Sequence, residues 1–165
     1  MGSAIKAKVI QLPKAELKSD KKILVTQPYI PSLDKYMHYV EQAFDNKWLT
    51  NGGPLLKELT NRLKSKLGVE HLLIVNNGTA ALQLAYRIKN LSGKTALTTP
   101  FTFPATSTAL EWQNVNIRLA DIEQDSWNLS ASNCEKQIQN GKVDAIVPVN
   151  IFGAPCDLDA FDELG

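Results

Sequence analysis

The sequence predicts a three-layer α/β/α protein, in which helices cover both faces of a mostly parallel sheet. From about residue 71 onward, short apolar segments of strand length alternate with amphipathic segments of helical length, which is the pattern of repeated strand–helix–strand units. A hydrophobic content of 44% with 21% charged residues is typical of a globular domain, and 165 residues are enough for one with a real core. Residues 1–22 are rich in lysine and are expected to form a flexible basic extension before a single domain over 23–165.

Two helices are expected before this alternation begins. The first starts at Ser32 or Asp34, because the apolar side chains that follow have helical spacing. The second follows a Gly-Gly-Pro turn, runs to about Leu67 and stops at Gly68, which can adopt the left-handed backbone that ends a helix. The apolar positions of the first helix are Leu33, Met37, Val40 and Phe44.

The α/β part is expected to contain four strands and four helices. The strands are expected over residues 71–75, 95–98, 115–120 and 145–149. The helices are expected over residues 78–88, about 103–112, 130–138 and 157–164. In the last helix, Asp157 is expected to act as the cap and Asp159 to lie in the first turn, both in structural roles. The apolar face of the helix over 78–88 is expected to consist of Ala81, Leu84, Ala85 and Ile88.

Charge and composition exclude several classes of function. The net charge of +1 provides no broad field for nucleic acid or anionic lipid, and no segment approaches the ~20 apolar residues of a membrane span. Two cysteines are too few for a disulfide framework, and without a signal peptide a cytoplasmic location is expected. Neither His38 nor His71 has a second ligand at metal-binding spacing, so no metal site is predicted.

The segment from Asn76 to Leu82 joins a predicted strand directly to a predicted helix. At such a junction the free N–H groups of the first helical turn favour an anion. Gly78 would let an oxygen approach the backbone closely, and Thr79 would add a hydroxyl donor, so a phosphate is the natural ligand. An ordinary turn with asparagine as the cap explains the same residues equally well. The glycine patterns of Walker and dinucleotide-binding loops are both absent.

Aromatic residues follow the next predicted strand, between Thr98 and Thr106. Ligands of open α/β sheets gather outside the carboxyl ends of the strands, and an aromatic side chain there can offer its face to a planar heterocycle. Phe103 is predicted to play this part, whereas Phe101 is predicted to be a core residue. A tight turn with Gly153 and Pro155 is expected after the last strand.

Taken in order, five segments resemble the DegT/DnrJ/StrS family of sugar aminotransferases. They are WLTNGGPLLKEL, NNGTAALQLA, TTPFTFPATSTALEWQN, LADIEQDSWNLS and AIVPVNIFGAPCDLDAF, which together extend over most of residues 23–165. The resemblance implies the large domain of fold type I enzymes that depend on pyridoxal 5'-phosphate (PLP). It also implies transfer of an amino group, usually from glutamate, to a nucleotide-linked keto sugar, in amino-sugar synthesis for a cell-surface polysaccharide or a secondary metabolite.

The resemblance also assigns roles to individual residues. Gly78 and Thr79 match the turn that holds the cofactor phosphate, and Phe103 matches the aromatic residue that stacks on the PLP ring. The loop from Trp48 to Gly53 matches a segment near the active site and the dimer contact. Asn150 departs from the histidine that many members carry there, so no substrate-binding residue is assigned. Asp121 and Asn128 match positions that we expect to be structural.

No catalytic residue is assigned within the chain. In the family, two catalytic residues lie further along than residue 165: the aspartate that pairs with the cofactor ring and the Schiff-base lysine. The chain is therefore expected to be a C-terminally incomplete fragment that is inactive alone. The full-length protein is expected to be a homodimer. One alternative is an inactive remnant that binds PLP weakly or pairs with a full-length relative. A second alternative is a PLP-dependent sugar dehydratase of the same family, and a third is a nucleotide-binding module without PLP.

Overall fold

The computed structural model describes residue 24 and residues 26–165. The chain divides into two compact units, Met1–Asn61 and Arg62–Gly165, and each is described by itself. The expected extension over residues 1–22 lies outside the described residues, and the expected domain over 23–165 stays a prediction.

The first unit contains helix α1 (Leu33–Asp45) and the beginning of α2 (Pro54–Leu67). Ser32 precedes α1 as its N-cap, and α2 is followed by Gly68 with a φ of +66°, as expected. The predicted apolar side chains of α1 do not form a core, however, since Leu33 is 71% exposed and Phe44 is 67% exposed.

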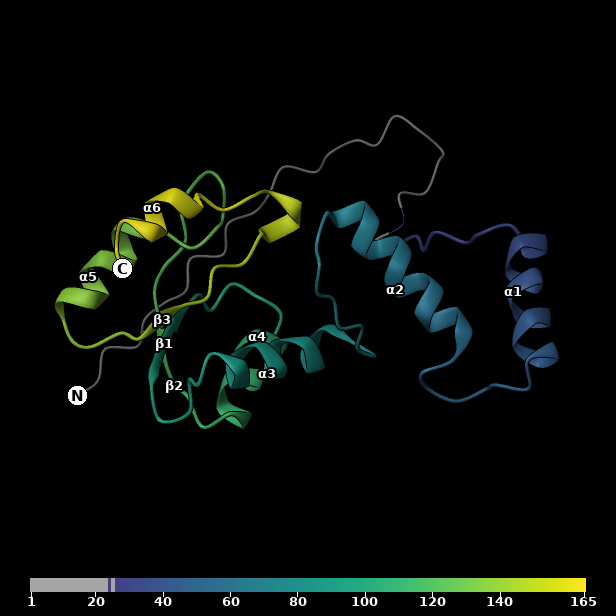
Figure 1. Ribbon diagram of the computed structural model, residues 1–165. Coiled ribbons are helices and arrows are strands. Elements are labelled where there is room, and N and C mark those ends of the chain that lie inside the picture. The colour runs from purple at the N-terminus through teal and green to yellow at the C-terminus, as the bar shows by residue number, and fades with distance from the viewer. Residues whose placement is uncertain (1–23, 25) are drawn as a thin grey trace, which may run out of the picture. The chain divides into compact units, whose positions relative to one another are not determined.

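Three parallel strands form a sheet in the second unit (Figure 1). Strand β1 (Thr95–Thr98) lies between β2 (Asn116–Leu119) and β3 (Ala145–Ile146), so the order is β2-β1-β3. Ala96 of β1 is paired with Ile117 on one side and with Ala145 on the other. All three strands were expected, although β3 is shorter than the predicted 145–149.

The strand expected over residues 71–75 does not form. None of these residues is buried, and Leu73 is 72% exposed. A strand exists only where a neighbouring strand accepts and donates its backbone hydrogen bonds, and the described residues pair no strand with this segment. An apolar sequence therefore indicated a preference for the sheet without indicating a partner.

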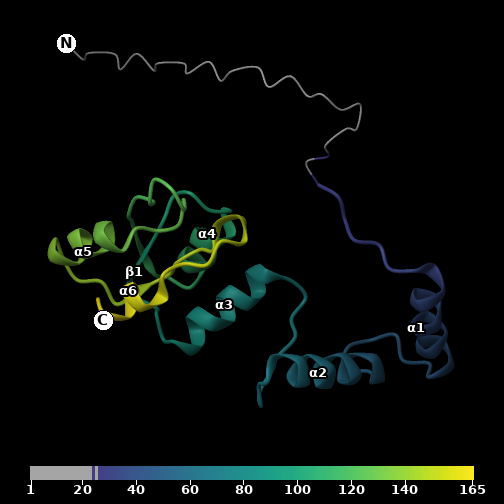
Figure 2. The ribbon, with the colours of Figure 1, turned by 90° about the horizontal axis from the view of Figure 1, so that it is seen from above.

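Four helices cover the two faces of the sheet and confirm the three-layer arrangement. Helices α3 (Gly78–Ile88) and α4 (Ala105–Trp112) lie on one side (Figure 1). Helices α5 (Ala131–Gln139) and α6 (Leu158–Asp162) lie together on the other (Figure 2). The consecutive residues Ala96 and Leu97 of β1 are both fully buried, Ala96 in the core under α3 and α4 and Leu97 in the core under α5 and α6.

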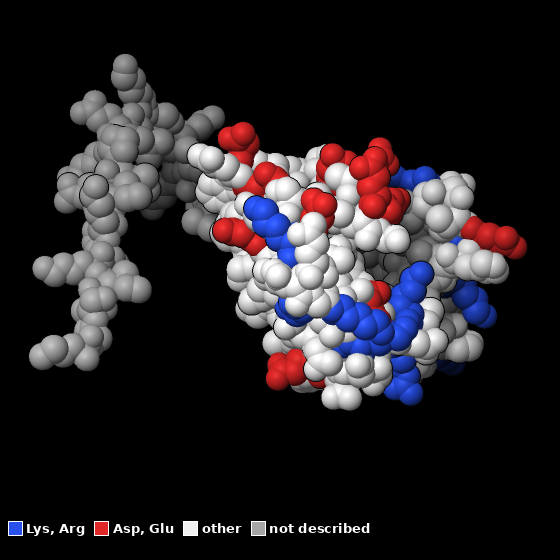
Figure 3. Space-filling model, turned by 90° about the vertical axis from the view of Figure 1, so that its left-hand side faces the viewer, with Lys and Arg blue, Asp and Glu red and all other residues white. Residues whose placement is uncertain are grey.

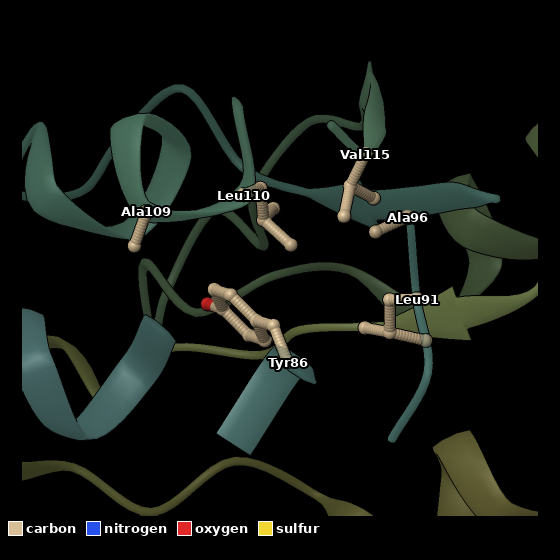
Figure 4. Packing of buried hydrophobic residues seen from close by; sticks show 6 residues of the cluster. All are labelled: Tyr86, Leu91, Ala96, Ala109, Leu110 and Val115. Carbon is tan, nitrogen blue, oxygen red and sulfur yellow. The ribbon is translucent and has the colours of Figure 1, made fainter. Parts of the chain in front are cut away.

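Helices α3 and α4 end in the same way, and these ends build one of the two cores. After α3, the N–H of Leu91 donates to the carbonyl of Tyr86 at 3.2 Å. After α4, the N–H of Val115 donates to the carbonyl of Leu110 at 3.1 Å. Both are Schellman motifs, which bring an apolar residue after the helix back against its last turn. All four side chains are buried in one cluster beneath the helices (Figure 4).

The face through which α3 packs differs from the expected one. Tyr86 is only 6% exposed and Leu82 packs against the same core, whereas Leu84 is 38% exposed and Ile88 is 74% exposed. Apolar side chains occupy nearly every side of this helix, so spacing alone does not select its buried face. The Schellman motif selects it, because it pulls Leu91 against Tyr86.

The surface carries both signs of charge. On the face shown in Figure 3, most acidic side chains lie toward the top and most basic ones toward the middle, and each sign also occurs among the other. Such mixing agrees with the net charge of +1. Among the residues that the structure describes, no helix is long and apolar enough to cross a membrane.

The Asn128 side chain joins two loops at the carboxyl ends of the strands. Its Oδ1 accepts from the N–H of Ile151 at 2.9 Å, and its Nδ2 donates to the carbonyls of Ala154 and Pro155 at 3.2 and 3.1 Å. Asn128 is only 4% exposed. The structure thus gives Asn128 the structural role that was expected for it.

We expect Asn128→Ala to lower the free energy of unfolding by about 2–4 kcal/mol, because a buried N–H and two carbonyls lose their partner. Urea unfolding followed by circular dichroism would measure this. Asn116→Ala is the matched control, since the exposed Asn116 side chain makes no hydrogen bond to a described residue, and it should change stability by less than about 0.5 kcal/mol. Equal effects of the two substitutions would show that Asn128 does not join the loops.

Burial raises the pKa of the Cys134 thiol from its ordinary value of 9.0 to about 11. Because the thiolate is the reactive form, Cys134 should resist Ellman's reagent at neutral pH until the chain is unfolded. The raised pKa stabilises the fold below pH 9, and this contribution should be lost as the pH rises toward 11. Unfolding free energies of the native protein and of Cys134→Ser across this range would measure the loss. Rapid labelling in the folded state would contradict the expectation.

Candidate cofactor-binding site

The N-terminus of α3 presents backbone N–H groups that the fold leaves free. Asn77 caps the helix, and its Oδ1 accepts from the N–H of Ala80 at 2.8 Å while its carbonyl accepts from Ala81 at 3.2 Å. The N–H groups of Gly78 and Thr79 donate to no described residue. These two groups, at the positive end of an 11-residue helix, can therefore receive an anion.

The space in front of Gly78 is open. A Cβ atom built on Gly78 would meet no other atom within 4 Å. The backbone of Gly78 is not in the left-handed region, so its conformation does not require glycine. What glycine provides here is unobstructed approach to the backbone, and a phosphate group fits this site.

The loop between β1 and α4 displays Phe103. The buried Thr99 accepts from the N–H of Phe101 through its Oγ1 at 3.0 Å, and the hydroxyls of Thr102 and Thr106 are 2.9 Å apart. These bonds hold the loop on both sides of Phe103, whose side chain is 77% exposed. An exposed ring on a held loop can stack on a planar ligand at little cost in conformational entropy.

Phe101 is not the core residue that we expected. Its side chain is 38% exposed and belongs to an aromatic cluster with Trp127 and Phe152, with ring centroids 5.4 and 6.4 Å away. Trp127 and Phe152 have left-handed backbones with φ of 64° and 52°, an unusual conformation for bulky residues. Its aromatic partners come from loops that are distant in sequence, and the local pattern around Phe101 did not indicate them.

The two predicted parts of the site lie at the same edge of the sheet. Arg87 and Asn90 at the end of α3 line one hollow with Gln113 and Asn114 at the end of α4. Helices whose C-terminal ends meet, and which pack on the same face of a parallel sheet, run in the same direction. Their N-terminal ends, which carry Gly78 and Thr79 in α3 and follow Phe103 in α4, therefore point to the carboxyl edge of the strands.

The loop from Trp48 to Gly53 belongs to the first unit and is folded on itself. Trp48 donates from its Nε1 to the carbonyl of Asn51 at 3.1 Å, and a Cβ atom on Gly53 would lie only 3.1 Å from the Trp48 ring. A side chain at position 53 would therefore displace the indole by a few tenths of an ångström. The expected place of this loop near the active site stays a prediction.

Sequence reasoning did not assign the role that Asn150 has. Its Oδ1 accepts from the N–H of Cys156 at 2.9 Å, and the Cys156 thiol donates to the carbonyl of Val149 at 3.2 Å. Burial raises the pKa of this thiol. Asparagine before a glycine–proline turn is a signal for such a side-chain-to-backbone bond.

Comparisons with solved structures place this arrangement in a known fold. DesI, a protein whose structure was solved with its TDP-sugar product, superposes with a TM-score of 0.77 at 31% identity, over 88% of this chain and 37% of that one. Spr1654 from Streptococcus pneumoniae, solved in its PLP form, superposes with the same TM-score at 25% identity, over 87% of this chain and 36% of that one. The three-layer unit is thus part of the fold type I large domain.

Sequence comparisons agree. The chain is 39% identical over 146 residues to the dTDP-4-amino-4,6-dideoxy-D-glucose transaminase of Escherichia coli, covering 88% of this chain and 39% of that enzyme. The chain therefore spans about two fifths of the length of this relative. The profile of the DegT/DnrJ/EryC1/StrS aminotransferase family matches residues 33–165. The chain belongs to the DegT/DnrJ/EryC1/StrS aminotransferase family.

Proposed function

We propose that this chain binds PLP as part of a nucleotide-sugar aminotransferase. The N–H groups of Gly78 and Thr79 and the Thr79 hydroxyl would hold the phosphate, and Phe103 would stack on the ring. The observation that carries this proposal is the open, unpaired N-terminus of α3, which lies at the same sheet edge as the exposed Phe103. Family relatives solved in PLP and PMP forms support the choice of cofactor.

When bound, PLP supplies an electron sink for transfer of an amino group. In this proposal the described residues bind and orient the cofactor, and none of them is assigned a catalytic role. The aspartate and the lysine that transamination requires are not assigned to any residue of this chain. We therefore expect the chain by itself to bind the cofactor without turnover.

The proposed substrate is a nucleotide-linked keto sugar, with an amino acid such as glutamate as the donor. A relative named as a transaminase of a dTDP-sugar and a structure solved with a TDP-sugar product support this class. A homodimer in the cytoplasm is proposed from the family resemblance.

Gly78→Ala separates binding from folding. Because the new methyl group meets no atom within 4 Å and alanine favours a helix more than glycine, the fold should be as stable as before or more so. The methyl group should nevertheless keep the phosphate from the helix N-terminus and weaken binding by about tenfold or more, a loss of at least about 1.4 kcal/mol. The probe is pyridoxamine 5'-phosphate, which has no aldehyde to react with lysines, followed by ³¹P NMR.

Two controls accompany this measurement. Pyridoxamine without its phosphate should bind the native chain weakly and should not distinguish the variant. Thr79→Val should also weaken binding, whereas Thr60→Val, which removes an exposed hydroxyl bonded within α2, should not. Unchanged affinity of Gly78→Ala for the phosphate probe would refute the phosphate assignment.

A further inference from the structure

A hollow of about 510 Å³ lies between the C-terminal ends of α3 and α4. Small-ligand sites have volumes of about 300–1,000 Å³, so its size suits a small molecule. This hollow lies where the chain leaves both helices toward the beginnings of β1 and β2. It is therefore at the amino edge of the sheet, opposite the candidate cofactor site. Its lining consists of Arg87, Asn90, Ser92, Trp112, Gln113 and Asn114.

The polar side chains of this hollow are unused by the fold. None of the six lining side chains makes a hydrogen bond to another residue in the described part of the chain. By contrast, the Asn77 side chain caps α3 and the Asn128 side chain makes three hydrogen bonds. Three amides, a hydroxyl and a guanidinium thus surround one hollow with their donors and acceptors free.

Trp112 adds a large apolar surface to this polar setting. Its side chain is 76% exposed, although the core residues Ala109 and Leu110 immediately precede the end of the same helix. A flat indole beside planar amides suits a pyranose ring, whose C–H groups can lie on the indole while its hydroxyls bond to the amides.

The local electrostatics favour a neutral ligand over an anion. Both helices end at the hollow, and the carbonyl end of a helix carries partial negative charge. This partial negative charge opposes a phosphate. Arg87 balances the helix ends and supplies donors to ligand oxygens.

We propose that this hollow, formed by the ends of α3 and α4, is a second binding site that takes a neutral saccharide. It is separate from the candidate cofactor site, and the proposal does not depend on the chain binding PLP. Asn90 and Asn114, with φ of 52° and 57°, end the two helices, and asparagine is common at such positions for conformational reasons alone. The test must therefore separate the backbone from the side chain.

NMR of the ¹⁵N-labelled 165-residue chain can test the proposal directly, since its three tryptophans give separate indole signals. Titration with glucose and with N-acetylglucosamine should shift the Trp112 signal saturably, with Kd values of about 1–10 mM, and leave those of Trp48 and Trp127 unchanged. Glycerol at matched hydroxyl concentration and inorganic phosphate should produce no such shift. The absence of a saturable sugar response would overturn the proposal, as would an equal response to glycerol or phosphate.

Substitution of Asn114 by glycine removes the amide and keeps the left-handed backbone available. The Asn114→Gly variant should unfold at the same urea concentration as the native chain and bind either sugar at least about fivefold more weakly, a loss of about 1 kcal/mol. Trp112→Ala should abolish binding, and Trp48→Phe should not affect it. Full sugar affinity in Asn114→Gly would show that the asparagine serves only the helix end. A Trp112 signal that depends on protein concentration would assign the hollow to a contact between copies of the chain. Either result would refute the proposal.

Discussion

The parallel pairing of β1 with β2 and β3 determines where the candidate functional residues of the second unit lie. Because the strands are parallel, each connection must cross the sheet and return. The loops that follow the three strands therefore gather at one edge, and the loops that lead from α3, α4 and α5 into the strands gather at the other. Thr99 to Phe103, Trp127 and Asn150 follow strands, whereas Asn90 and Asn114 follow helices. The two proposed sites are opposite ends of one arrangement.

The two edges are stabilised by different interactions. At the amino edge, backbone bonds close each helix and bury Leu91 and Val115, so the side chains at the surface are not needed for folding. At the carboxyl edge, side chains stabilise the loops, since Asn128 and Asn150 form hydrogen bonds with the backbone of the 151–156 segment. Left-handed residues such as Trp127 and Phe152 cost about 1–3 kcal/mol each, and the Asn128 bonds offset that cost.

The sequence predicted well those elements whose cause is local. The β1 limits, the Asp157 cap of α6 and the Gly68 stop of α2 all follow from short patterns, and the structure has each of them. The resemblance located Gly78, Thr79 and Phe103, and the structure leaves all three accessible to a ligand.

The predictions that failed depend on residues that are distant in sequence. Residues 71–75 are apolar, but a strand needs a partner that the described chain does not provide. The buried face of α3 depends on its contact with Leu91, which lies beyond the helix. Phe101 contacts the rings of Trp127 and Phe152 and does not enter the core. In each case the local pattern described a preference and a contact elsewhere in the fold decided the outcome.

The exposed aromatic side chains at the two edges of the sheet suit different kinds of ligand. Phe103 stands in a loop whose threonine bonds hold it outward, so its exposure is built by the fold around it. Trp112 is exposed because it lies at the end of a helix, and it is surrounded by polar side chains that make no hydrogen bond within the described residues. A ring held outward beside free helix N–H groups suits an anionic planar molecule, whereas a ring beside free amides and the negative ends of two helices suits a neutral hydroxylated one. The direction of the helices thus selects the kind of ligand at each end.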